Sequence, residues 1–203
     1  MSHPLAGGIA GFARLIAGCQ VFRPDENPQM HGQHIFYANH SSHLDAVVVW
    51  AVLDRALRER TRPVAAHEYW LATRVRRFLA GEVLRFVLIQ REGIGRAGIE
   101  AMYAALDAGD SLIVFPEGTR GLGEDIAAFK PGLHHLCEHR PEADAVPVYL
   151  ENLNRVLPKG ELIPVPLMSR VLFGRPLRPH AGELRASFLE RAREALLELR
   201  ESL

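Results

Sequence analysis

The sequence predicts one α/β domain, with a central sheet flanked by helices. Short runs rich in β-branched and aromatic residues alternate with longer segments of helical period, which is the order expected of an α/β fold. The chain has 203 residues, and a chain of this size buries about 70% of its unfolded surface in one core. Hydrophobic residues make up 48% and charged residues 24%, a balance that excludes disordered, collagen-like and coiled-coil proteins. We therefore expect a single domain over residues 1–203.

The first element is a mostly apolar segment, residues 5–22, with a helix expected over residues 5–20. Four glycines interrupt this segment and Arg14 lies in its middle. A helix that spans a bilayer needs about 20 apolar residues, and a secretory signal has basic residues before its apolar run, so neither is predicted. Two interpretations remain open: a helix packed on the core, or an interfacial helix that enters one leaflet of a membrane.

Strands and helices alternate over the remainder of the chain. The predicted strands are short β-branched and aromatic runs at residues 34–38, 63–66, 86–90, 111–115, 145–150 and 170–173. The predicted helices have helical periodicity and lie at residues 44–60, 69–80, 94–108, 132–138 and 182–201. The last is the clearest, because it carries one apolar stripe of Leu184, Phe188, Ala192, Ala195, Leu196, Leu199 and Leu203. Binding sites in α/β sheets lie just beyond strand ends, where loops with glycine or proline occur here.

The charge distribution limits the kinds of binding partner, and the cysteine content indicates the redox compartment. The 24 basic and 24 acidic residues give a formal net charge of zero, which argues against nucleic-acid binding. The charges are unevenly placed, because residues 50–91 carry nine arginines and four acidic residues, whereas residues 92–154 carry four basic and eleven acidic residues. The basic stretch is suited to phosphates or an anionic membrane surface. Cys19 and Cys137 are too few for a disulfide framework, so a reducing compartment is expected.

The residues best suited to chemistry follow the strand predicted at residues 34–38. There residues 39–45 read Asn-His-Ser-Ser-His-Leu-Asp and lead into a helix. With Ser42 as the N-cap, the Asp45 carboxylate can fold back on the Nδ1–H of His40, which leaves Nε2 free as a general base. Ser42 and Asp45 also have the spacing of a capping box, so a purely capping role for Asp45 is the alternative. We favour His40 over His43 because its spacing permits this fold-back.

Two further loops carry candidate binding residues. Residues 115–120 read Phe-Pro-Glu-Gly-Thr-Arg, where Gly118 lets the backbone approach a ligand and Arg120 can grip a phosphate through paired hydrogen bonds. Residues 90–96 place Arg91 and Arg96 around a glycine-containing turn, which is a weak signal on its own. Taken alone, each loop is better explained as a solvent-exposed turn.

Taken together, these elements resemble the glycerolipid acyltransferase family, which includes the 1-acylglycerol-3-phosphate acyltransferases. The resemblance covers about residues 36–177. The family's first motif, Asn-His followed after four residues by Asp, matches at Asn39, His40 and Asp45. The second, a hydrophobic strand ending in Arg, matches at residues 86–91; the third matches throughout residues 115–120 and is followed by Phe-x-x-Gly at 129–132. The fourth, a hydrophobic strand containing Pro, matches at residues 146–149.

The resemblance implies a central mixed β-sheet flanked by helices, as in glycerol-3-phosphate acyltransferases. It also implies transfer of a fatty acyl group from an acyl-CoA or acyl carrier protein thioester to the hydroxyl of a lysophospholipid, with 1-acylglycerol-3-phosphate as the expected acceptor. His40 and Asp45 are then the catalytic pair, and no metal, cofactor or cysteine-bound acyl intermediate is expected. The implied substrate-binding residues are Arg91, Glu117, Gly118, Thr119, Arg120 and Lys130.

The roles expected within this site differ from residue to residue. Arg91 and Arg120 would hold the acceptor's phosphate, and Lys130 would be an auxiliary cation. Glu117 would position Arg120 or the acceptor hydroxyl. The oxyanion of the tetrahedral intermediate would be bound by N–H groups of the turn around Ser41 or Gly118.

Because both substrates carry acyl chains, the resemblance implies a peripheral protein at the inner face of the cytoplasmic membrane. Residues 5–22 and the arginine-rich residues 55–77 are the expected docking face, with acyl carrier protein as a candidate partner and no nucleic acid. One alternative is a lipid-binding protein that has the fold without turnover. Another is a metal-dependent hydrolase that uses His40, His43 and Asp45, or the histidines of residues 134–139, although neither group has a recognised metal spacing.

Overall fold

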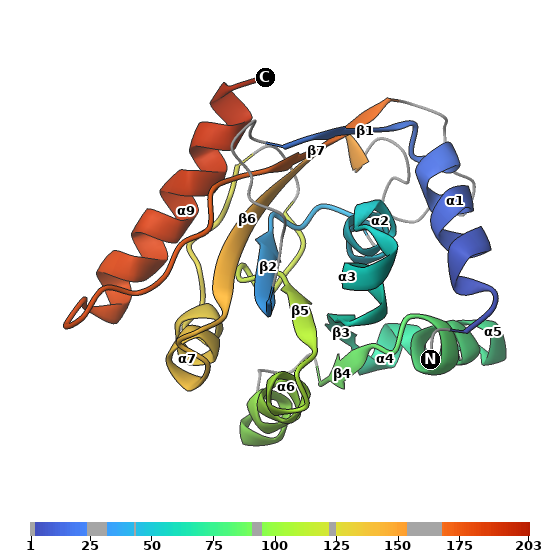
Figure 1. Ribbon diagram of the computed structural model, residues 1–203, viewed down its shortest axis with the longest axis horizontal. Helices are drawn as coiled ribbons and strands as arrows, with labels where there is room; N and C mark the ends of the chain where they lie inside the picture. Colours follow the sequence, from blue (N-terminus) through green and yellow to red (C-terminus); the bar gives the residue numbers. More distant parts are fainter. Residues whose placement is uncertain (1–2, 24–31, 43, 91–94, 122–124, 154–167) are drawn as a thin grey trace.

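A mixed β-sheet runs through the middle of the protein (Figure 1). The computed structural model describes residues 3–23, 32–42, 44–90, 95–121, 125–153 and 168–203. Among these residues, seven strands form one sheet in the order β1-β7-β6-β2-β5-β3-β4. All neighbours are parallel except β6 and β7, which are antiparallel. The strands are β1 Cys19–Phe22, β2 His34–Ala38, β3 Thr61–Ala66, β4 Val87–Ile89, β5 Ser111–Val114, β6 Asp144–Glu151 and β7 Ser169–Phe173.

Helices cover both faces of the sheet (Figure 1). Strand β2 is buried along its whole length, and its side chains alternate between two cores. Phe36 and Ala38 pack on the side of α1 and α2, whereas Ile35 and Tyr37 pack on the side of α6, α7 and α9. The helices are α1 Ala6–Ile16, α2 Asp45–Val52, α3 Arg55–Glu59, α4 His67–Trp70, α5 Arg74–Phe78, the π-helical turn η1 Leu79–Val83, α6 Arg96–Asp107, α7 Gly132–His139 and α9 Arg185–Glu201.

The six predicted strands are confirmed as β2 to β7, with boundaries within two residues. Two of the predicted helices are broken, however. The helix expected over residues 44–60 ends at Val52, because Leu53 is extended and Asp54 caps α3 by accepting from the backbone N–H of Leu57 at 2.9 Å. The helix expected over residues 69–80 is divided into α4, α5 and η1, with Thr73 capping α5 in the same way. Each break lies at a residue type that competes for backbone donors.

The two ends of the chain also differ from the prediction. Helix α1 ends before Gly18, whose φ of +51° is a conformation that favours glycine, and residues 19–22 form the edge strand β1 instead of continuing the helix. At the other end, α9 buries the centre of its predicted apolar stripe at Phe188, Ala192 and Leu196. The outermost residues of that stripe are exposed instead: Leu184 by 74% and Leu203 by 44%.

Helix α1 packs on the core through its small residues. Ala6 and Ala10 are buried against the α2 side of the sheet. Arg14 donates through Nε to the carbonyl of Ala51 at 2.6 Å and through Nη2 to that of Leu53 at 3.3 Å, so its charge lies at the carboxyl end of α2. The packed-helix interpretation is therefore correct for this face of α1. None of the described helices combines the length and the apolarity needed to span a membrane.

Candidate active site

Two loops of the candidate site meet at the carboxyl ends of adjacent parallel strands. His40 lies two residues beyond β2, and residues 115–120 follow β5, which pairs with β2. The backbone N–H of Gly121 donates to the carbonyl of His40 at 2.9 Å and joins the two loops. Ligands of open α/β sheets bind at this edge, where the loops that follow neighbouring strands come together.

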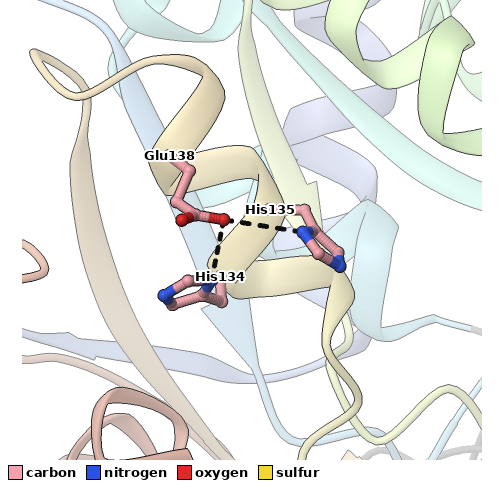
Figure 2. A group of neighbouring side chains, drawn as sticks. All are labelled: His134, His135 and Glu138. Atoms are coloured by element: carbon pink, nitrogen blue, oxygen red, sulfur yellow. Dashed lines mark ion pairs between the residues drawn. The ribbon is translucent and has the colours of Figure 1, made fainter. Parts of the chain in front are cut away.

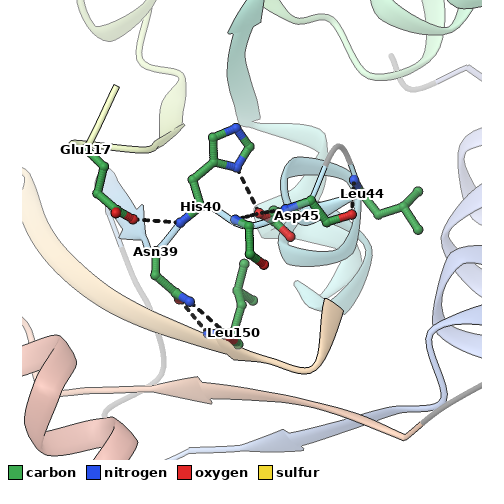
Figure 3. Close-up of polar contacts among 8 residues, drawn as sticks. Asn39, His40, Leu44, Asp45, Glu117 and Leu150 are labelled. Carbon is green, nitrogen blue, oxygen red and sulfur yellow. Dashed lines mark hydrogen bonds and ion pairs between the residues drawn. The ribbon is translucent and has the colours of Figure 1, made fainter. Parts of the chain in front are cut away.

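The side chains of His40 and Asp45 are in direct contact (Figure 3). His40 Nδ1 lies 2.8 Å from Asp45 Oδ2, and the carboxylate is completely buried whereas the His40 side chain is 22% exposed. The same oxygen accepts the backbone N–H groups of Ser41 at 2.6 Å and Ser42 at 2.8 Å. An ionised carboxylate only accepts, so the proton of this contact belongs to Nδ1 and the lone pair is left on Nε2, across the ring from Asp45.

The turn that makes this contact differs in one detail from the expectation. Helix α2 begins at Asp45 with Leu44 at the N-cap position, so Ser42 is not the N-cap residue. The Asp45 carboxylate nevertheless reaches back to the N–H of Ser42, as the acidic member of a capping box does. One carboxylate oxygen thus bonds to the backbone of the turn and also contacts the His40 ring, so the capping role and the pairing with His40 are compatible. His43 lies outside the described residues.

Three neighbours hold His40 in place (Figure 3). Its ring stacks on that of Phe115 with a centroid distance of 4.3 Å and an interplanar angle of 24°. Its backbone N–H donates to Glu117 Oε1 at 2.8 Å. The preceding residue, Asn39, exchanges two hydrogen bonds of 2.9 and 2.8 Å with the backbone of Leu150 in β6. Sequence reasoning missed these holding roles of Asn39 and Glu117, although both residues belong to the motifs.

The carboxylate of Glu117 lies differently from the expectation. Glu117 is 4% exposed; its Oε1 accepts from His40 N and its Oε2 from Ala127 N at 3.0 Å, rather than contacting Arg120. A buried carboxylate needs donors, and backbone N–H groups supply them here. The expected oxyanion donors are also engaged, because Ser41 N donates to Asp45 and Gly118 N to the carbonyl of Phe115 at 3.0 Å.

A cavity of about 180 Å³ opens beside His40. Its polar lining residues are His40, Glu68, Gln90, Thr119, Arg120 and Lys130. Its apolar lining residues include Val64, Trp70, Met102, Val114, Leu133 and Leu136. The apolar residues come from β3, α4, α6, β5 and α7, so both the strand ends and the helices that cover them shape the cavity. A lining that combines charged and apolar side chains suits an amphipathic ligand.

Two cations that line the cavity, Arg120 and Lys130, are available to bind an anion. Lys130 lies over Gly118, where an added Cβ would come within 2.6 Å of Lys130 Nζ, and Gly118 has a φ of +71°. The backbone conformation thus favours glycine at this position, and the Lys130 side chain lies against the space that a Cβ would fill. Within the described part of the chain, neither Arg120 nor Lys130 has an ion-pair partner. The third expected cation, Arg91, lies outside the described residues.

The two cysteines lie apart from this cavity. Burial raises the pKa of the Cys137 thiol to about 12, and it raises the pKa of Cys19 as well. Both thiols are therefore protonated at neutral pH, and a protonated thiol is a poor nucleophile.

Comparison with known proteins places this geometry in a family. The family profile described as Acyltransferase matches residues 20–151. A protein of Dictyostelium discoideum named Taffazin is 27% identical over 155 residues, a match that covers 70% of this chain and 53% of that protein. The chain thus spans about half the length of this curated relative.

A solved structure shares the fold. The crystal structure of the 1-acyl-sn-glycerophosphate (LPA) acyltransferase PlsC from Thermotoga maritima superimposes with a TM-score of 0.75 at 20% identity, over 98% of this chain and 80% of that one. The predicted mixed sheet flanked by helices is confirmed. The family profile spans more than half of the chain and includes both loops that meet at His40, and we conclude that the protein belongs to the acyltransferase family.

Proposed function

We propose that the protein transfers a fatty acyl group from an acyl-CoA or acyl carrier protein thioester to the hydroxyl of a lysophospholipid, with 1-acylglycerol-3-phosphate as the acceptor. One observation carries the proposal: the His40–Asp45 pair lies at a cavity whose lining combines two cationic side chains, Arg120 and Lys130, with many apolar ones. A lysophospholipid likewise combines an anionic phosphate group with an apolar acyl chain.

In the proposed mechanism, His40 Nε2 accepts the proton of the acceptor hydroxyl as that oxygen attacks the thioester carbonyl. Asp45 stabilises the imidazolium that forms, because its buried carboxylate lies 2.8 Å from Nδ1. The tetrahedral intermediate then breaks its C–S bond, and the imidazolium returns the proton to the departing thiolate. General-base assistance of this kind contributes about 10²- to 10⁴-fold to the rate. The scheme uses neither a metal ion nor a covalent acyl-enzyme.

The remaining site residues act on the acceptor. Arg120 and Lys130 line the cavity on the side of His40 and would bind the phosphate group, with Arg91 as a further cation. Gly118 and Thr119 directly precede Arg120 and also line the cavity; the absence of a side chain at Gly118 and the hydroxyl group of Thr119 would let the phosphate approach this loop. Glu117 acts through His40 and the loop at Ala127, so we assign it a positioning role.

The proposal is tested by thiol release from palmitoyl-CoA in the presence of 1-acylglycerol-3-phosphate. We expect release that depends on the acceptor, together with formation of the diacyl product. Glycerol 3-phosphate and a lysophosphatidylcholine, tested in parallel, separate the contributions of the acyl chain and of the phosphate monoester. Binding of lysophospholipid without thiol release from palmitoyl-CoA or a palmitoyl carrier protein would instead support the lipid-binding alternative.

We further propose that the protein works as a peripheral protein at the inner face of the cytoplasmic membrane. Helix α1 exposes Phe12 and Leu15, its N-cap residue Leu5 is exposed as well, and α5 exposes Val75 and Phe78. The two helices adjoin near the N-terminus (Figure 1), where the rings of His3 and Phe78 meet edge to face at 5.4 Å. Apolar side chains beside basic ones are typical of helices that lie in a membrane interface.

The arginines of α5 give a test of this docking surface. Replacing Arg74, Arg76 and Arg77 with glutamine is expected to lower the affinity for anionic vesicles by about 100-fold, since a basic residue near an anionic bilayer contributes about 1 kcal/mol. Vesicle sedimentation measures this effect. The matched control changes three exposed arginines near the start of α9, Arg175, Arg178 and Arg185, and removes the same charge. Equal losses in both triple variants, or no loss in the first, would contradict the assignment.

A further inference from the structure

Helix α7 carries a cluster of metal-ligating side chains outside the cavity. His134, His135 and Glu138 each offer one ligand atom, and these three atoms all lie within 4.8 Å of one another. Figure 2 shows both histidines directed toward the same carboxylate oxygen, Glu138 Oε2, which lies 3.0 Å from His134 Nδ1 and 3.6 Å from His135 Nδ1. We propose that these residues form a binding site for one divalent transition-metal ion of the Zn²⁺ class, separate from the acyltransferase chemistry.

The spacing of the three residues suits a helical metal site. Glu138 is four residues from His134 and three from His135, and residues at these separations lie on one face of a helix. Helical metal sites use both separations, as in His-Glu-x-x-His and Glu-x-x-His ligand pairs. Two imidazoles and one carboxylate are also a known three-residue ligand set for zinc, with water as the fourth ligand.

The distances agree with this coordination. Zinc lies about 2.0–2.1 Å from nitrogen ligands and about 2.0–2.2 Å from carboxylate oxygens, so adjacent ligands of a tetrahedral site lie about 3.3 Å apart. The two nitrogen-to-oxygen distances, 3.0 and 3.6 Å, lie on either side of this value. The third distance, between the two nitrogens, is at most 4.8 Å.

The burial of His134 supports the site. Its side chain is 8% exposed, and its Nδ1 lies 3.0 Å from Glu138 Oε2 without the geometry of a hydrogen bond to any described residue. A buried nitrogen that is poorly paired is unfavourable, and coordination of an ion would satisfy it. His135 is 42% exposed and Glu138 59%, so the cluster is open to solvent on the side from which an ion and a water ligand would enter.

Neighbouring residues define the limits of the cluster. Phe188 of α9 packs against the ring of His134 at 5.7 Å and closes the buried side. His139, on the same helix, pairs through Nε2 with Asp107 at 2.9 Å and stacks on Tyr103 at 3.9 Å, so it belongs to a different contact. The opposite face of α7 carries Leu133 and Leu136, which line the cavity. A bound ion would thus stabilise a helix whose other face shapes the candidate active site.

The test is calorimetric titration of Zn²⁺ into tag-free, chelator-treated protein, with Co²⁺ absorption reporting the coordination geometry. We expect one ion per chain. Even loss of a residue that only supports a metal ligand weakens binding by about 10- to 100-fold, so His135→Ala and Glu138→Gln should each weaken it by at least that factor. The matched control His139→Gln should bind as the wild type does. His135 and Glu138 are chosen because they are exposed, whereas a change at buried His134 would also disturb packing.

Thermal unfolding gives a second readout. At a Zn²⁺ concentration about 100 times the dissociation constant, the Tm of the wild type should rise by about 5–10 °C, and that of Glu138→Gln should not. Absence of stoichiometric binding, or equal affinities in Glu138→Gln and His139→Gln, would overturn the site. Neither outcome bears on acyl transfer, because the proposed ion takes no part in that reaction.

Discussion

Replacing His40 with alanine is expected to lower kcat for acceptor-dependent thiol release by about 10²- to 10⁴-fold. An alcohol is a weak nucleophile at neutral pH, and His40 is the imidazole that lines the cavity beside Arg120 and Lys130. The KM for the acceptor should change little, because the phosphate contacts belong to other residues. Steady-state kinetics with palmitoyl-CoA and 1-acylglycerol-3-phosphate measure both quantities.

The control for this variant is His139→Gln. His139 lies on α7, pairs with Asp107 and does not line the cavity, so the change should leave kcat as it is. Thermal unfolding of the His40→Ala protein separates a catalytic effect from a loss of folded protein. A folded His40→Ala variant that releases thiol at the wild-type rate would show that another group accepts the proton.

Replacing Asp45 with asparagine should lower kcat to a similar extent. With its amide oxygen in the place of Oδ2, asparagine can still accept the N–H groups of Ser41 and Ser42 and the Nδ1–H of His40, so the turn before α2 should be retained. The amide is neutral, however, and no longer supplies the negative charge that stabilises the imidazolium formed in the proposed mechanism.

The comparison with Asp45→Ala separates the effect of the side chain on catalysis from its effect on the stability of the fold. Alanine removes the acceptor and leaves two N–H groups unsatisfied beside a buried position, which costs about 1–3 kcal/mol for each group. We therefore expect a near-normal Tm with low kcat for Asp45→Asn, and losses of both for Asp45→Ala. If Asp45→Asn kept full activity, Asp45 would serve only as a helix cap.

The contact between His40 and Asp45 could be predicted because it is local. Asp45 follows His40 by five positions, and a single turn between a strand and a helix is enough to bring the two side chains together. The strands were predictable for a similar reason, since β2 is buried on both faces and reads as an apolar run. Its side chains form the two cores regardless of which strands lie beside it.

The features that could not be predicted depend on partners far along the chain. Strand β1 exists because Cys19 pairs with Ser169, 150 residues later, and three of its four residues are exposed. Asn39 bonds to Leu150 because the sheet order places β6 next to β2. Glu117 meets the backbone of His40 because β5 lies on the other side of β2. The local sequence of a strand does not reveal which strands will lie beside it in the sheet.

A general base at His40 needs its lone pair on Nε2, and ¹⁵N NMR of histidine-labelled protein at neutral pH measures directly which ring nitrogen carries the proton. Comparison with the His40→Ala spectrum assigns the His40 resonances. We predict a protonated Nδ1 and an unprotonated Nε2 in the wild type. A wild-type His40 with the proton on Nε2 would contradict its role as the general base.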